Sequence, residues 1–405
     1  MEYTLHRHTM AKGWRKFLEE ESEHQWLAIS LFFIFIIIGA FAIHGTSKLT
    51  GMDITNNSEM PNSRIMDIQH DSHDDYTAIA HTSEGMYLYQ FHDDKEIVIL
   101  EPNSNNQGYN IDFLSLMNNG TISTSISENS IMFIDNGITS YLNLSDERGS
   151  FNINQISQNY NQDLDSMILI TDEGGFTSFR GTGIDGMPSS ATPESNNVEW
   201  KEISAVSENE WIATGVLISS SGTGDNPASP SINPVVGHVI WTGGFTAPMI
   251  QEIYPGTDGE FHSMIKMDDE MIIAGTSQTV VFDSKDNSFE SIDITSKAAL
   301  KSDCDTIWFF GSMHSETVIK WSEDDSRVIE LQHKIPIEIE TFDSFGEMIF
   351  MYGTDASGNN KILTFDSSSY GSIESGRGFL NFSFILIFSI AFVVMGWNVY
   401  DRMSS

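Results

Sequence analysis

The chain has 405 residues and holds 20 Lys and Arg against 57 Asp and Glu, which gives a formal charge of −37 at pH 7. This charge excludes a nucleic-acid-binding body, because contacts to phosphate require Lys and Arg. A single Cys excludes a disulfide framework and any cysteine-based zinc or iron–sulfur site. The apolar share of 40% is that of a folded protein and not of a disordered acidic tail.

Two uncharged apolar segments stand near the ends of the chain. Residues 26–43 read WLAISLFFIFIIIGAFAI, and residues 379–399 read FLNFSFILIFSIAFVVMGWNV. Each segment is long enough to cross about 30 Å of hydrocarbon as a helix. We therefore predict transmembrane helices over 26–45 and 379–399, with the lipid bilayer as a partner. Residues 40–42, Ala-Phe-Ala, leave open the alternative that the first segment is a cleaved signal peptide.

Basic residues near the apolar segments predict the orientation of the chain. Four Lys and Arg residues lie within 1–25, so this segment is predicted to be cytoplasmic. Two crossings return the tail 400–405 to the cytoplasm and leave everything between them outside the cell membrane. Residues 46–378 hold 15 Lys and Arg against 51 Asp and Glu, so nearly all the negative charge is predicted to be extracytoplasmic.

One pattern recurs seven times between the apolar segments: an acidic or Asn-rich turn, an apolar strand, a Gly/Ser turn and an alternating strand. The apolar strands begin near Tyr76, Thr121, Met167, Trp211, Met271, Ile307 and Met348. Their starts are 36 to 60 residues apart, and the strands are short and rich in β-branched and aromatic residues. Such a repeat is typical of four-stranded propeller blades, which cover their sheet faces by packing round a ring.

The chain therefore resembles seven-bladed β-propellers of the WD40-like and quinoprotein-like class. The resemblance covers residues 63–375, rests on period and pattern, and lacks the Gly-His and Trp-Asp signatures of WD40 blades. The predicted fold is an all-β seven-bladed propeller flanked by two transmembrane helices, with a linker over 46–62. Either residues 370–375 or the stretch before Ser63 closes the ring. Residues 217–237 are predicted to form an inserted surface loop in the fourth repeat.

Acidic residues concentrate in the turns between first and second strands and between third and fourth strands, which share one face of a propeller. We call this surface the acidic face. The opposite face is predicted to be mainly Ser, Gly and Asn. Because each set of strands is predicted to start and end there, both membrane linkers should join it and the acidic face should point away from the bilayer. Candidate partner-binding residues on the acidic face are Asp268, Asp269, Glu270, Asp303, Asp305, Glu323, Asp324 and Asp325.

Residues 70–75, His-Asp-Ser-His-Asp-Asp, form the densest cluster of metal-ligand side chains. The candidate metal ligands are His70, Asp71, His73, Asp74 and Asp75. The alternative is a solvated turn, because the same position is acidic in nearly every repeat. No cofactor is predicted, with calcium between carboxylates of adjacent turns as the alternative. The sequence has no nucleophile elbow, Walker loop, dinucleotide fingerprint or HExxH motif, so no catalytic residue is assigned.

These observations predict a membrane-tethered extracytoplasmic propeller that acts as a protein-binding or scaffold module and not as an enzyme. A cationic or calcium-bridged partner would bind the acidic face. The first alternative is a hydrolase or oxidoreductase with its site in the central channel. The innermost strands, such as 65–68, 111–116 and 337–342, carry scattered Asp and Glu and share no His. The second alternative is that the acid is a solubility adaptation to a salty medium.

Overall fold

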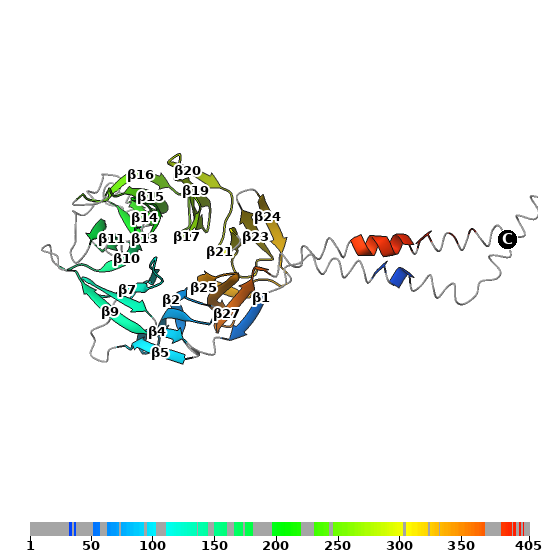
Figure 1. Ribbon diagram of the computed structural model, residues 1–405, viewed down its shortest axis with the longest axis horizontal. Coiled ribbons are helices and arrows are strands. Elements are labelled where there is room, and N and C mark those ends of the chain that lie inside the picture. Colours follow the sequence, from blue (N-terminus) through cyan, green and yellow to red (C-terminus); the bar gives the residue numbers. More distant parts are fainter. Residues whose placement is uncertain are drawn as a thin grey trace, which may run out of the picture. The chain divides into compact units, whose positions relative to one another are not determined.

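In a computed structural model of the protein, residues Gly51–Ser367 form one compact unit of seven antiparallel sheets arranged in a ring (Figure 1). A second unit consists of Met1–Thr50 together with Ser368–Ser405. The structure describes residues 32–34, 36–37, 52–56, 63–72, 74–92, 95–102, 111–135, 137–144, 150–159, 166–172, 175–180, 197–219, 231–242, 246–302, 305–322, 325–331, 333–368, 382–390, 392–393, 397 and 400.

Each sheet is one blade, and six blades are built from strands that are consecutive in the chain. The sheets are β2-β3-β4-β5, β6-β7-β8-β9, β10-β11-β12, β13-β14-β15-β16, β17-β18-β19-β20, β21-β22-β23-β24 and β25-β26-β27-β1. The strands are β1 (Met52–Asn56), β2 (Arg64–His70), β3 (Tyr76–Thr82), β4 (Gly85–His92), β5 (Lys95–Leu100), β6 (Ser115–Leu116), β7 (Ile122–Ser127), β8 (Ser130–Asp135), β9 (Ile138–Asn143), β10 (Ile153–Gln158), β11 (Ser166–Thr171), β12 (Phe176–Arg180), β13 (Val198–Ser207), β14 (Glu210–Ser219), β15 (Ser231–Ile240), β16 (Met249–Pro255), β17 (Phe261–Met267), β18 (Glu270–Gly275), β19 (Thr279–Asp283), β20 (Ser288–Ile292), β21 (Ala298–Ser302), β22 (Thr306–Phe310), β23 (Thr317–Ser322), β24 (Asp325–Glu330), β25 (Ile337–Phe345), β26 (Met348–Asp355) and β27 (Asn360–Asp366).

The seventh blade closes the ring with a strand from the other end of the chain. β1 pairs antiparallel with β27, from Met52 opposite Phe365 to Asn56 opposite Lys361. Pairing with β1 satisfies the edge of β27 and joins both ends of the ring in one sheet. The stretch before Ser63 therefore supplies the closing strand, and part of the predicted linker 46–62 belongs to the ring.

This closure also places both ends of the ring on the acidic face. Asp366, the last residue of β27, pairs with Met348, which directly follows the turn that joins β25 to β26. Met52 begins β1 next to the same turn, opposite Phe365. The prediction that both linkers join the opposite face is therefore wrong. Its physical reason is the strand count: β25, β26 and β27 are three strands, and an odd number ends on the face opposite to its start.

The hydrophobic core lies between successive blades. At the junction of the third and fourth blades, for example, Phe176 packs on Trp200 with ring centroids 5.1 Å apart, and Trp211 packs near Trp241 at 6.2 Å. Gly237 makes room for this packing, because a Cβ there would stand 2.5 Å from the Trp200 ring. Large aromatic side chains therefore fill the space between these two blades.

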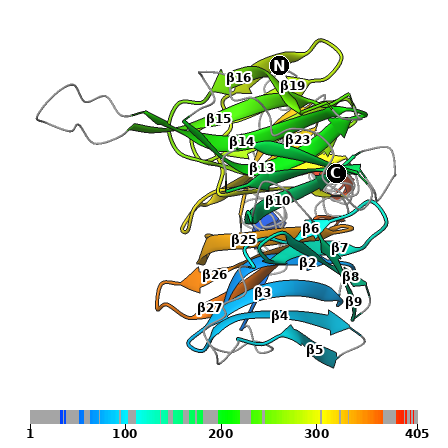
Figure 2. The same cartoon turned by 90° about the vertical axis from the view of Figure 1, so that its left-hand side faces the viewer.

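The insertion in the fourth repeat is partly strand. β14 and β15 extend the hairpin so that Ser219 pairs with Ser231 (Figure 2). Residues 217–219 and 231–237, which were predicted as loop, therefore continue the sheet, whereas residues 220–230 lie outside the described part. The β-branched residues Ile218, Ile232 and Val235 suit this extension, because β-branched side chains favour strands.

The second unit is helical at residues 32–34, 36–37 and 382–390. Within the residues that the structure describes, no helix is both long enough and apolar enough to span a membrane. The structure does not describe segment 1–25. It describes only parts of the predicted membrane segments 26–45 and 379–399. The Phe32 and Phe388 rings stack with centroids 5.3 Å apart, so the two ends of the chain contact each other within this unit.

Candidate functional site

Two turns of the fifth blade meet on the acidic face. The turn between β17 and β18 contains Asp268, whose φ of 44° lies in the left-handed region that a tight hairpin turn requires. Ser284, in the turn between β19 and β20, donates from its backbone N and its Oγ to the Asp269 carbonyl oxygen at 3.0 and 2.7 Å. Asp283 Oδ1 accepts the Lys285 N–H at 2.8 Å. These bonds hold the acidic side chains of both turns in one group.

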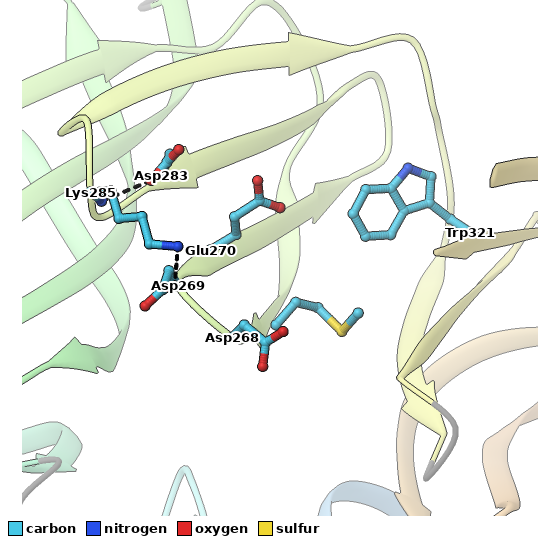
Figure 3. Close-up of a pocket in the computed structure, with 7 residues that line it drawn as sticks. Asp268, Asp269, Glu270, Asp283, Lys285 and Trp321 are labelled. Atoms are coloured by element: carbon cyan, nitrogen blue, oxygen red, sulfur yellow. Dashed lines mark hydrogen bonds and ion pairs between the residues drawn. The ribbon is translucent and has the colours of Figure 1, made fainter. Parts of the chain in front are cut away.

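A surface cavity of about 190 Å³ lies beside these turns. Lys285 Nζ lies 2.5 Å from Asp269 Oδ2, and both side chains are largely exposed. Trp321, near the end of β23 in the sixth blade, stands across the cavity from Glu270 (Figure 3). The residues that line the cavity are Met267, Asp268, Asp269, Glu270, Asp283, Lys285 and Trp321.

The structure separates the candidate partner-binding residues into two groups. Asp268, Asp269 and Glu270 line the cavity. Asp305 pairs with Lys301 Nζ at 2.7 Å, and Asp325 pairs with the Arg327 Nε at 2.5 Å, both in the sixth blade. The other three candidates, Asp303, Glu323 and Asp324, lie outside the described residues.

Sequence reasoning missed the two apolar members of the cavity, Met267 and Trp321. Trp321 stands two residues before the acidic run 323–325, and that closeness was the available signal. Glu270 and Trp321 are 51 residues apart in the chain and come from different blades, so spacing alone does not bring them together.

The opposite face also carries acidic residues. Glu84, Glu101 and Glu128 are exposed in turns or connections on that face. It also carries ion pairs, such as Lys334 Nζ with Glu316 Oε1 at 2.8 Å. This face therefore contains acidic residues beside the predicted Ser, Gly and Asn of described turns such as 275–278 and 355–360.

His70 is part of the core between the first and seventh blades. Its side chain is buried and stacks on Phe350 with ring centroids 4.1 Å apart. Nδ1 lies 3.1 Å from Asp343 Oδ2, and Nε2 lies 3.3 Å from the Tyr352 hydroxyl. Both ring nitrogens therefore have protein partners.

The other metal-ligand candidates lie in the turn after His70. Asp74 is exposed, Asp75 Oδ2 lies 3.4 Å from His92 Nδ1, and partial burial raises the pKa of Asp71. His73 lies outside the described residues. Among the side chains that the structure does describe, no three His, Cys, Asp or Glu are grouped so that they could hold a metal ion.

Polar side chains of the innermost strands, which border the predicted central channel, connect neighbouring blades. Asp67 Oδ2 accepts the Leu114 N–H at 2.6 Å, and burial raises the pKa of Asp67 to about 7. Burial likewise raises the pKa of Glu202 to about 7. Further bonds of this kind run from the His70 N–H to Asp343, from Ser115 to the Ile156 carbonyl, from Lys266 to the Val206 carbonyl, from Lys301 to the Lys266 carbonyl and from Ser344 to the Lys301 carbonyl.

Within the described residues, the innermost strands contain a second histidine besides His70 of β2. His262 in β17 has Nδ1 at 2.9 Å from Ser263 Oγ and Nε2 at 3.1 Å from the Ser296 carbonyl oxygen. Burial lowers its pKa to about 4, so the ring is neutral at pH 7. Its Nε2–H donates to the carbonyl, so His262 serves the junction of the fifth and sixth blades.

The sequence matches no protein-family model and no curated protein. Its fold matches 588 chains of solved structures. The chain is a seven-bladed β-propeller. A fold this widespread does not select a function.

Three of the matching structures illustrate the range of proteins that share this propeller. The extracellular domain of the putative one component system BT4673 from B. thetaiotaomicron has a TM-score of 0.47 and 12% identity over 80% of this chain, which spans only 43% of that chain. The Neurospora crassa Pan2 WD40 domain has a TM-score of 0.49 and 10% identity, and the match covers 79% of this chain and 96% of that chain. A chain of a mitotic checkpoint complex has a TM-score of 0.50 and 9% identity, and the match covers 78% of this chain and 91% of that chain. At these identities the likeness concerns the fold alone.

Proposed function

We propose that this propeller is a membrane-tethered module that binds a protein partner with its acidic face. The cavity beside Asp269 carries the proposal. Its volume of about 190 Å³ is below the roughly 300–1,000 Å³ of small-molecule sites, so it suits one side chain of a protein better than a substrate. The channel supports the same choice, because Asp67 and Asp343 hold main-chain groups of neighbouring blades. We therefore propose binding and not catalysis.

Exposed apolar side chains support attachment to the cell membrane. Phe33 exposes 58% of its surface, and Phe382 and Ile385 expose 64% and 62%. Covering apolar surface is worth about 25 cal/mol per Å², and the hydrocarbon of a bilayer would cover these side chains. The stacking of Phe32 on Phe388 suits two neighbouring helices of a membrane anchor. The basic residues of segment 1–25 favour a cytoplasmic position for that segment, and the ring would then lie on the extracytoplasmic side.

The position of the tethers defines where the partner would lie. Both ends of the ring, at Met52 and Asp366, are on the acidic face. A partner held there would therefore lie on the side of the ring from which the chain returns to the bilayer. Confinement to the membrane would raise the effective concentration of such a partner. A cationic partner would also offset repulsion between the acidic face and anionic headgroups.

Cysteine labelling of intact cells tests the membrane topology. Cys304→Ser removes the native thiol, and Tyr141→Cys or Ser405→Cys then introduces a single reporter. Tyr141 is 56% exposed on β9, the outermost strand of the second blade. A membrane-impermeant maleimide should label Tyr141→Cys in intact cells and Ser405→Cys only after permeabilisation. Labelling of Ser405→Cys alone in intact cells would reverse the proposed orientation.

Cross-linking in native membranes tests the binding role. The triple variant Asp268→Asn, Asp269→Asn, Glu270→Gln should lose the cross-linked partner. The matched control Glu84→Gln, Glu101→Gln, Glu128→Gln removes the same charge from the opposite face and should keep it. Equal loss in both variants would mean that overall charge, and not this face, retains the partner.

A further inference from the structure

The cavity beside Asp269 has two features that an acidic turn by itself does not have. It encloses a volume, and one of its walls is an indole ring. Trp321 packs part of its surface on the core between the fifth and sixth blades, a cluster that includes Met267. The six-membered ring of the indole points edge-first toward Glu270 across the cavity (Figure 3). We call this site the Trp321 cavity.

These walls suit a flat cation. An indole face attracts a cation through the ring quadrupole, and arginine adds stacking of its planar guanidinium. A carboxylate beside the edge of the ring can accept two parallel N–H donors of a guanidinium that stacks over the ring face. The sixth blade already contains one such pairing, because Lys320 Nζ lies 5.7 Å from the Trp308 ring centroid.

The charge of the cavity is also complementary to a cation. Four carboxylates line it against one ammonium group, that of Lys285. Lys285 pairs with Asp269 at 2.5 Å and lies on the far side of Glu270 from Trp321 in Figure 3. The chain's own lysine therefore does not stand between the indole and Glu270.

We propose that the Trp321 cavity binds an arginine side chain of the protein partner. The inference rests on the proposed function, because it names the group of the partner that the acidic face recognises. Interfaces commonly gain most of their affinity where an arginine or aromatic side chain enters a pocket.

Three peptides that differ in one residue test the proposal on the full chain in detergent. They carry arginine, lysine or citrulline at the same position between serines and glycines, and citrulline keeps the shape of arginine without its charge. Titration calorimetry should show the arginine peptide binding about tenfold more tightly than the citrulline peptide and more tightly than the lysine peptide. Equal affinity for arginine and citrulline, or for arginine and lysine, would overturn the assignment of a guanidinium.

Variants then assign the binding to this cavity. Trp321→Leu and Glu270→Gln should each lower the affinity for the arginine peptide about three- to tenfold. The matched controls Tyr141→Leu and Glu208→Gln remove an exposed aromatic ring and a carboxylate of the equivalent turn in the fourth blade, and should leave affinity unchanged. If Glu208→Gln weakens binding as much as Glu270→Gln, general charge explains the binding and the cavity does not.

The two proposals fail in different ways. If Trp321→Leu keeps the cross-linked partner and the arginine peptide does not bind, the arginine site is wrong and the binding face stands. If the peptides behave as expected but no partner cross-links in native membranes, the cavity recognises guanidinium and the proposed function is wrong.

Discussion

Carboxylates in the central channel and carboxylates on the acidic face are the same chemical groups in different surroundings. Asp67 and Asp343 in the channel accept main-chain N–H groups of neighbouring blades at 2.6 and 2.5 Å. Asp269 and Asp325 on the acidic face stand beside exposed basic side chains. The difference teaches that the channel carboxylates hold the ring together, whereas those of the face form exposed ion pairs that contribute little to the ring.

Energies support this division. A hydrogen bond to a charged group contributes about 1.5–3 kcal/mol, and an orphaned buried donor adds its own desolvation cost. An exposed ion pair contributes about 0–1 kcal/mol. Substitutions in the channel should therefore change the stability of the ring, and substitutions on the face should change binding.

Asp343→Ala should produce the largest effect on stability, a loss of about 3 kcal/mol in the free energy of unfolding. The substitution orphans the His70 N–H and the buried His70 ring, which Asp343 contacts at 2.5 and 3.1 Å. Urea unfolding of the full chain in detergent measures the change. Asp325→Ala is the control, and a loss no larger than that of the control would contradict the division.

Glu202→Gln should stabilise the ring at pH 8 by about 1–3 kcal/mol and have little effect at pH 4. The unfolded chain ionises Glu202 near its ordinary pKa of 4.5, whereas the folded chain keeps the proton to a pKa of about 7. The stability that protonated Glu202 contributes is therefore complete below pH 4.5 and is lost as pH rises through 7. The urea midpoint of unfolding, measured for both variants between pH 4 and pH 8, tests whether the substitution stabilises the ring only at high pH. Glu199→Gln, at an exposed position of the same strand, is the control.

Asp269→Asn should change the free energy of unfolding by no more than about 0.5 kcal/mol, because its pair with Lys285 is exposed. The same experiment in KCl addresses the salt alternative. A ring that unfolds without high salt, whichever residue is at position 269, would favour general adaptation of the acid over a binding role.

Local patterns predicted the blades well, and they failed where distant segments meet. The starts predicted at Tyr76 and Met348 are the first residues of β3 and β26, because alternation and turn residues are local signals. The predicted acidic residues 268–270 do line the cavity. Trp321 was missed because its place opposite Glu270 depends on how the fifth and sixth blades pack.

By itself the sequence determined the period, and therefore the number of blades and the turns that carry the acid. Only the tertiary structure decided that β1 completes the blade of β25 to β27, which places both ends of the ring on the acidic face. The physical reason is that a short strand of five residues carries too little pattern to name its partner. Its pairing depends on the otherwise unpaired edge of β27, which only the folded ring brings next to it.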